Sequence, residues 1–195
     1  MQSMKFRLNG IDSLLINNPQ TSDPLNKYAK EMKSISSKRK KTDEDIIAMR
    51  EIELRAKIYW DSEIKIYIPS TWITAAISGV SWSKAKIKKA DIRSSVFPTK
   101  AKIKLHYDGM KNIQEPIDIV KNSDFHNVVS LKQGQVRVVK AAPIFRNWFA
   151  DIELDYDNSL LNERELMTLI ETASSYGGYG DFRPTHGRAR VEFLN

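Results

Sequence analysis

The amino-acid sequence predicts an α+β protein with an antiparallel sheet. Segments in which apolar and polar residues alternate, the pattern of half-buried strands, occur near both ends of the chain and between them. Segments with apolar residues at helical spacing separate several of these strands. A chain of 195 residues without an internal repeat is expected to form a single domain. We expect that domain to carry a polar insertion near residues 17–60 and a basic insertion near residues 80–140.

The first half of the chain alternates predicted strands with predicted helices. Met4, Phe6 and Leu8 alternate with basic residues, which is typical of a half-buried strand. Residues 17–41 are polar, and we expect no regular structure in them. Thr42 precedes three acidic residues and predicts a helix start, because its hydroxyl can cap the helix and acids favour the positive end of the helix dipole. The elements expected here are strands at 4–8, 64–68 and 100–107 and helices at 42–59 and 69–79, the last ended by Gly79.

The second half ends in a strand, a helix, a glycine-rich loop and a final strand. Asn162 and Glu165 form a capping-box pair, and apolar residues follow them at helical spacing. A hairpin is expected around Gly134, which separates two apolar segments. The elements expected in this half are strands at 128–131, 135–140, 148–156 and 188–193 and a helix at 162–175.

Basic charge is concentrated in the first part of the chain. The protein carries 31 Lys+Arg and 24 Asp+Glu, a net charge of +7, and residues 1–110 hold 21 of the basic and 12 of the acidic residues. Within them, segment 84–104 contains eight basic residues and one acidic residue, Asp91. Clustered Lys and Arg favour a polyanionic partner, nucleic acid before a membrane surface, although a solvated basic face is an equal alternative. The eight residues are Lys84, Lys86, Lys88, Lys89, Arg93, Lys100, Lys102 and Lys104.

Half of the eight glycines lie between residues 177 and 187. They follow a predicted helix, whereas the glycines of dinucleotide-binding and P-loop motifs precede theirs, so neither motif is present. Aromatic and arginine side chains are interleaved with these glycines, and both kinds stack on unpaired bases. We expect a binding loop, and the alternative is a helix C-cap followed by an irregular connection.

The order strand, helix, glycine loop, strand at the C-terminus resembles the RAMP superfamily of CRISPR-associated RNA-binding proteins. The resemblance covers about the last 50 residues, with a compatible strand–helix–strand order upstream. It implies a ferredoxin-like (RRM-like) antiparallel sheet with helices on one face and long insertions. It also implies that segment 84–104 takes the place of a thumb-like hairpin. The loop residues that it places against an RNA backbone are Gly177, Gly178, Gly180, Arg183, Gly187 and Arg188.

A second resemblance spans most of the chain. Segments 23–30, 37–45 and 180–188 are similar to a family of uncharacterised tailed-phage and prophage proteins. This resemblance implies a cytoplasmic location in a bacterial host cell and brings no activity with it. The sequence also contains no apolar run long enough to cross a membrane, so we expect no membrane partner.

Residues suited to catalysis or metal binding are sparse. The absence of cysteine excludes disulfide scaffolds, Cys-based zinc sites, iron–sulfur clusters and thiol catalysis. His186, in the glycine loop, is the best placed of the three histidines for a general base, but no partner can be assigned to it. Asp151, Glu153, Asp155 and Asp157 suggest a Mg²⁺ site, although the solvated face of an edge strand explains them better. We expect no metal and no cofactor.

These observations favour a non-catalytic protein that binds RNA or single-stranded DNA by its phosphate backbone. Two other classes stay open. One is a metal-independent endoribonuclease that uses His186, and the other is a protein-binding or self-assembling inhibitor of host defence. The sequence is also compatible with a homo-oligomer. The residues expected to bind nucleic acid are the eight basic residues of segment 84–104 together with Gly177, Gly178, Gly180, Arg183, His186, Gly187 and Arg188.

Overall fold

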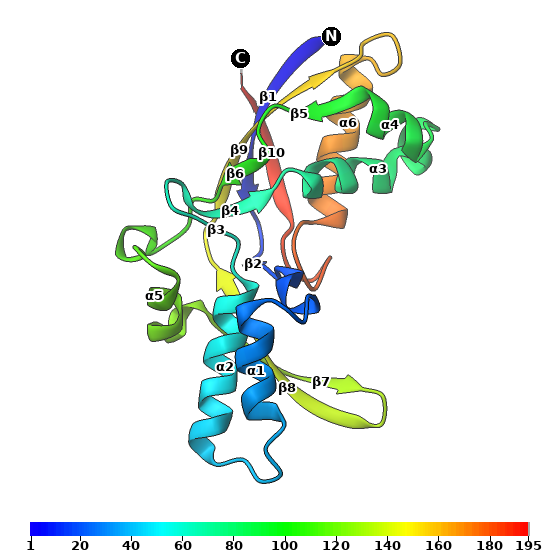
Figure 1. Cartoon of the computed structure of the whole chain (residues 1–195). Coiled ribbons are helices and arrows are strands. Elements are labelled where there is room, and N and C mark those ends of the chain that lie inside the picture. The colour runs from blue at the N-terminus through cyan, green and yellow to red at the C-terminus, as the bar shows by residue number, and fades with distance from the viewer. Residues whose placement is uncertain (195) are drawn as a thin grey trace. The chain divides into compact units, whose positions relative to one another are not determined.

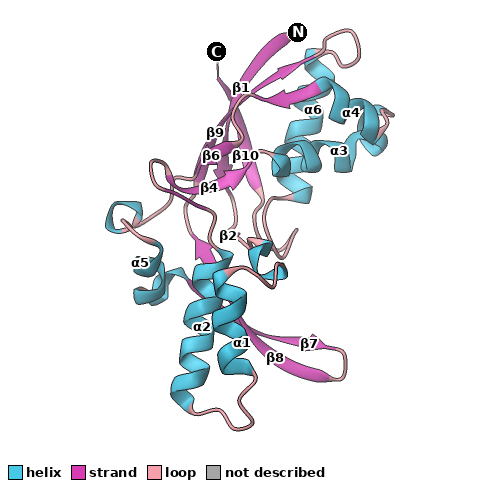
Figure 2. Cartoon of the chain, in the orientation of Figure 1, coloured by secondary structure: helices cyan, strands magenta, loops and turns pink. Residues whose placement is uncertain are grey.

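The computed structural model describes residues 1–194, apart from the side chains of Leu131, Gln133, Val136 and Arg137. These residues form six α-helices and ten strands, and the sheets are antiparallel, so the predicted α+β class is confirmed (Figures 1 and 2). The helices are α1 (Lys27–Ser36), α2 (Asp43–Lys57), α3 (Thr71–Ala85), α4 (Lys89–Ser95), α5 (Pro116–Lys121) and α6 (Glu163–Thr172). The strands are β1 (Gln2–Gly10), β2 (Leu14–Leu15), β3 (Trp60–Asp61), β4 (Lys65–Pro69), β5 (Val96–Pro98), β6 (Lys102–Lys104), β7 (His126–Gln133), β8 (Val136–Phe145), β9 (Phe149–Tyr156) and β10 (Ala189–Leu194).

The chain divides into two compact units. Unit 1 contains residues 1–14 and 61–110 and the chain from 145 onwards, and unit 2 contains residues 15–60 and 111–144. The predicted polar insertion at 17–60 therefore falls within unit 2, whereas the predicted basic insertion at 80–140 is divided between the units. No helix within residues 1–194 has the length and apolar character needed to cross a membrane.

Unit 1 is built on a four-stranded antiparallel sheet in the order β10-β1-β9-β5. Phe6 of β1 lies opposite Phe193 of β10 and Ile152 of β9. The alternating apolar residues of these strands therefore lie on the same face of the sheet. Phe6 and Leu8 are fully buried on that face. Helices α3 and α6 contact each other, and each contacts an edge strand of the sheet (Figure 1).

The opposite face of this sheet carries cross-strand polar pairs. Arg7 donates two hydrogen bonds to Asp151, at 2.6 and 2.9 Å, and the Lys5 amine lies 3.2 Å from a carboxylate oxygen of Glu153. The guanidinium lowers the pKa of Asp151 chiefly through its hydrogen bond. Strand β9 lies inside the sheet, so the expectation of an edge strand is wrong, and the partners of Asp151, Glu153 and Asp155 come from β1. Asp157 follows β9 and accepts hydrogen bonds from Ser159.

Unit 2 packs α2 against α1, α5 and a hairpin of β7 and β8. Leu54 of α2, Val120 of α5 and Ala141 of β8 form a buried cluster. The hairpin turn contains Gly134 at φ +61°, as its turn chemistry predicts. Thr42 and Asp45 form a capping box at the start of α2, where the sequence predicts a helix start.

Three predictions for local structure need correction. The polar stretch 17–41 is not irregular throughout, because Asn26 caps α1 by accepting a hydrogen bond from the Tyr28 amide. Gly79 does not end α3, which continues to Ala85. A glycine inside a helix costs only about 1 kcal/mol relative to alanine, so packing can carry the helix through it. Segment 84–104 is not a hairpin, since β5 pairs with β9 and β6 pairs with β4.

Candidate nucleic-acid interface

The eight basic residues of segment 84–104 are all exposed, but they lie on several elements of unit 1. Lys84 is in the last turn of α3, Lys86 follows that helix with φ +59°, and Lys88 precedes α4. Lys89 and Arg93 belong to α4, whereas Lys102 and Lys104 lie on β6, directly after Lys100. The eight residues are close in sequence, but the fold divides them between two places. Five lie at the corner formed by α3 and α4, and Lys100, Lys102 and Lys104 lie on or directly before β6.

The helical corner combines basic and aromatic side chains. Trp82 is 59% exposed, and the Lys86 amine lies 5.8 Å from the centre of its indole ring. Lys84 and Lys86 line a hollow of about 370 Å³ together with Arg164 of α6. We call Trp82, Lys84, Lys86 and Arg164 the Trp82 cluster. Glu165 also lines the hollow, but its carboxylate accepts a hydrogen bond from the Asn162 amide as half of a capping box.

Of the basic residues on β6, Lys102 interacts with two neighbouring side chains. The Lys102 amine donates to a carboxylate oxygen of Asp61 at 2.5 Å and lies 5.3 Å from the centre of the Tyr67 ring. The hydrogen bond from Lys102 and two backbone amides lower the pKa of Asp61 to about 2. Ile103 is buried between exposed Lys102 and Lys104, which confirms the predicted strand with one basic face.

The glycine loop closes on itself. Gly178, Gly180 and Gly187 have positive φ angles, between +72° and +79°, which side chains rarely adopt. A Cβ atom on Gly187 would overlap the carbonyl oxygen of Tyr179, whose amide donates to the Gly187 carbonyl at 2.9 Å. Gly177 differs, because it ends a single π-helical turn after α6 and has open space where a Cβ would lie. The loop's own packing therefore requires Gly187 and favours glycine at 178 and 180.

The loop is also fixed to the segment that follows β1. The Gly187 amide donates to the Ser13 carbonyl at 3.0 Å, and the Arg188 guanidinium donates to the Asp12 carboxylate at 2.5 Å. Tyr179 is fully buried and its hydroxyl lies 2.8 Å from the Ser174 hydroxyl. Burial raises the pKa of Tyr179 to about 12, so it stays a neutral phenol at physiological pH.

Arg183 and His186 have different surroundings. Arg183 is exposed, whereas His186 is partly covered and its backbone amide donates to the Phe182 carbonyl at 3.1 Å. Within residues 1–194, no side chain is hydrogen-bonded to the His186 imidazole, so no base or acid partner is placed for it. The described residues also include no group of three or more His, Asp or Glu side chains arranged to hold a metal ion.

Two features of the surface were missed from sequence. The sequence did not indicate that Trp82 is exposed or that Arg164 lies beside Lys84 and Lys86, because both depend on how α3 packs on α6. Tyr176, which is 75% exposed, lines a hollow of about 320 Å³ together with Arg190. The helix before Tyr176 and the strand that contains Arg190 were both predicted, but their proximity was not, because it depends on how the turn after α6 packs against β10.

No protein-family model matches this chain, and no curated protein is found to be similar to it.

Proposed function

We propose that this protein binds single-stranded nucleic acid without cleaving it, and that the Trp82 cluster is the main contact. The observation that carries the proposal is the exposed indole of Trp82 beside the Lys86 amine, which lines one hollow together with Lys84 and Arg164. An exposed tryptophan among cations contributes little to the free energy of folding, because its indole is not buried and surface cations stabilise a fold only weakly. The same combination suits a nucleic acid, because bases stack on the ring while phosphates pair with Lys and Arg.

Other basic residues of segment 84–104 add positive charge to unit 1 outside the Trp82 cluster. Lys88, Lys89 and Arg93 continue along the chain through α4, and Arg93 lines a hollow beside the first turn of α3. Phosphate contacts position a nucleic acid but carry no sequence information, so we infer binding that is largely independent of sequence. Lys102 contributes less because Asp61 already neutralises it.

We also infer that unit 1 has the ferredoxin-like topology. If β1, β5, β9 and β10 are counted as strands one to four, the sheet order is 4-1-3-2, the order of a βαββαβ fold. Helix α3 then takes the place of the first helix and α6 that of the second. This order supports a relationship to the RAMP superfamily, in which the glycine loop would approach RNA through its exposed Arg183. The similarity to phage proteins, and with it a location in the bacterial cytoplasm, stays a further proposal.

A binding experiment with two matched variants tests this function. Fluorescence anisotropy with labelled single-stranded RNA and DNA, in EDTA and at two salt concentrations, measures affinity and salt dependence. The first variant changes Lys84, Lys86 and Arg164 to Gln, and the second changes Lys100, Lys102 and Lys104 to Gln. Both variants lose three positive charges, so any difference between them reports position and not net charge.

The first variant is expected to lose affinity for every sequence tested. Each lost phosphate contact should reduce the slope of log affinity against log salt by about 0.7 for a single strand. The second variant should lose less, because Asp61 engages Lys102. Absence of binding at low salt would contradict the proposal. Cleavage of the RNA in EDTA would instead favour the endoribonuclease, and a defined assembly without bound nucleic acid would favour the protein-binding alternative.

A further inference from the structure

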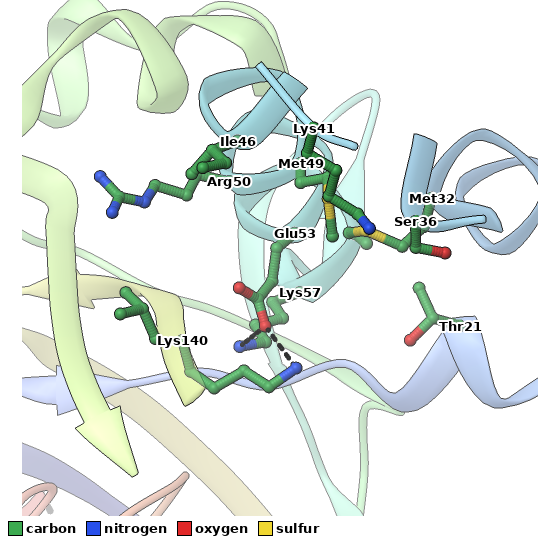
Figure 3. A pocket seen from close by; sticks show the side chains of 12 residues that line it. Thr21, Met32, Ser36, Lys41, Ile46, Met49, Arg50, Glu53, Lys57 and Lys140 are labelled. Carbon is green, nitrogen blue, oxygen red and sulfur yellow. Dashed lines mark hydrogen bonds and ion pairs between the residues drawn. The ribbon is translucent and has the colours of Figure 1, made fainter. Parts of the chain in front are cut away.

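Unit 2 contains a cavity that is independent of the proposed nucleic-acid surface. It has a volume of about 470 Å³ and is lined by residues of α1, α2 and β8 and of the turns that precede each helix (Figure 3). Cavities that hold small organic ligands fall in the range of roughly 300–1,000 Å³. The size alone therefore admits a small molecule.

The walls of this cavity are largely apolar and adaptable. Met32 of α1 and Met49 of α2 line it, with Ile46 and Ala56 on α2 and Val139 on β8. Figure 3 draws the two methionine side chains near each other. Methionine is unbranched and polarisable, so it fits apolar groups of differing shape. These walls suit the hydrocarbon or aromatic part of a ligand.

A partly buried ion network lines the same cavity. The Glu53 carboxylate lies 3.0 Å from the Lys57 amine and 3.5 Å from the Lys140 amine (Figure 3). It also accepts a hydrogen bond from the Ala141 amide at 2.9 Å. The side chains of Glu53 and Lys57 are only 14% and 16% exposed. Lys57 also donates to the Ala141 carbonyl at 2.5 Å. Glu53 and Lys57 are thus satisfied by each other and by β8.

Positive charge remains after this network is counted. The cavity is lined by four cations, Lys41, Arg50, Lys57 and Lys140, and by one carboxylate, Glu53, which leaves a net charge of +3. The Lys140 side chain is 47% exposed and its single ion pair is long, so it can turn toward a ligand. Among the described residues, the Arg50 guanidinium has no hydrogen-bond or ion-pair partner.

We propose that this cavity binds a small amphipathic organic anion, an acyl or aryl group that carries one carboxylate or phosphate. The apolar group lies against Met32 and Met49, and the anion is held by the Lys140 amine, while the exposed Lys41 and Arg50 add positive charge around the cavity. The methionine walls distinguish this site from a surface for a polyanion, which needs cations along an open face and no apolar pocket. The site does not depend on the function proposed for unit 1.

Methionine methyl resonances give a readout at the site itself. The full chain, labelled with ¹³C at its methionine methyl groups, is titrated separately with octanoate and with phenyl phosphate. Inorganic phosphate and 1-octanol serve as probes that lack the apolar part or the charge. Signals are assigned with Met32→Leu and Met49→Leu. We expect both methyl signals to shift saturably with octanoate or phenyl phosphate, while the signal of buried Met4 in unit 1 stays in place.

Matched charge variants test how the anion is held. Lys140→Gln should weaken octanoate binding about fivefold to tenfold, because it removes a charge-assisted hydrogen bond. Arg50→Gln should weaken binding less, because Figure 3 draws the Arg50 guanidinium directed away from Met32 and Met49. Lys30→Gln removes an exposed cation of α1 that does not line the cavity, and it should leave the affinity unchanged. Ligand-free Met32 and Met49 signals that keep their wild-type positions report that unit 2 is folded in each variant.

Four outcomes would overturn the proposal. Methyl signals of Met32 and Met49 that no probe moves would show that the cavity takes no such ligand. Equal shifts with inorganic phosphate would reduce the site to a cluster of surface cations. An affinity for 1-octanol equal to that for octanoate would show that the cavity does not select for an anion. Shifts caused only by an acidic, leucine-containing peptide would make the cavity a protein-docking groove.

Discussion

The glycine loop and the Trp82 cluster belong to the same unit, but the fold requires the unusual residues of the loop and does not require those of the cluster. The unusual residues of the loop are explained by its own packing: Gly187 approaches the Tyr179 carbonyl, and Arg188 is paired with Asp12. Trp82, Lys84 and Lys86 are exposed, and the described contacts give them no comparable structural role. A residue that the fold already requires is weaker evidence for binding than one that the fold does not require.

The largest expected effect separates the glycines of the loop. Gly187→Ala should reduce the free energy of unfolding by about 2–4 kcal/mol, because a Cβ atom would clash with Tyr179 and φ is positive. Gly177→Ala is the matched control, since it has open space and no positive φ. It should change the free energy by less than about 1 kcal/mol. Urea denaturation measures the free energy of unfolding of both variants. Equal values for the two would contradict the conclusion that the packing of the loop requires Gly187.

The next effect concerns stacking on the Trp82 cluster. Trp82→Ala should weaken single-strand binding about tenfold, because stacking of a base on an aromatic side chain contributes about 1–3 kcal/mol. Its stability should change by no more than about 0.5 kcal/mol, as expected for an exposed side chain. Tyr176→Ala, at another exposed aromatic residue, is the control. Anisotropy titrations that show the larger loss for Tyr176→Ala would move the binding surface to the end of α6.

Local patterns in the sequence predicted most of the elements of unit 1. Strands β1, β9 and β10 and helix α6 were readable because each has one buried face, which fixes a period of two or of 3.6 residues. The capping box of Asn162 and Glu165 also lies within four residues of sequence. Such signals depend on near neighbours in the chain, so no knowledge of the tertiary structure was needed.

The candidate site was only partly predictable, for the opposite reason. The eight cations were visible as a composition bias, but the engagement of Lys102 depends on Asp61, which lies 41 residues earlier in the chain. Arg164 joins Lys84 and Lys86 only because α6 packs on α3. In the same way, the sequence counts the glycines of the loop but not the close approach of Gly187 to Tyr179. Long-range packing decided which side chains were free.

A smaller effect compares two arginines of the glycine loop. Arg188→Gln should reduce the free energy of unfolding slightly, since its ion pair with Asp12 is partly exposed. Arg183→Gln should leave stability unchanged, because Arg183 is exposed. It should weaken single-strand binding about twofold to fivefold if the loop approaches the phosphate backbone. Stability and affinity are measured on both variants, and reversed effects would assign the binding role to Arg188.

The smallest effect is a pH dependence that arises outside both regions. The His106 imidazole stacks on the Phe149 ring at 4.3 Å, and burial, with a contribution from Lys104, lowers its pKa below 6.5. The unfolded chain therefore binds the proton more tightly than the folded chain, so this part of the stability is full above pH 6.5 and declines as the pH falls through the lower, folded-state pKa. His106→Phe retains the aromatic stack and should reduce the difference in unfolding free energy between pH 8 and pH 5. A difference that persists unchanged in His106→Phe would contradict this assignment, because the pH dependence would then arise from another group.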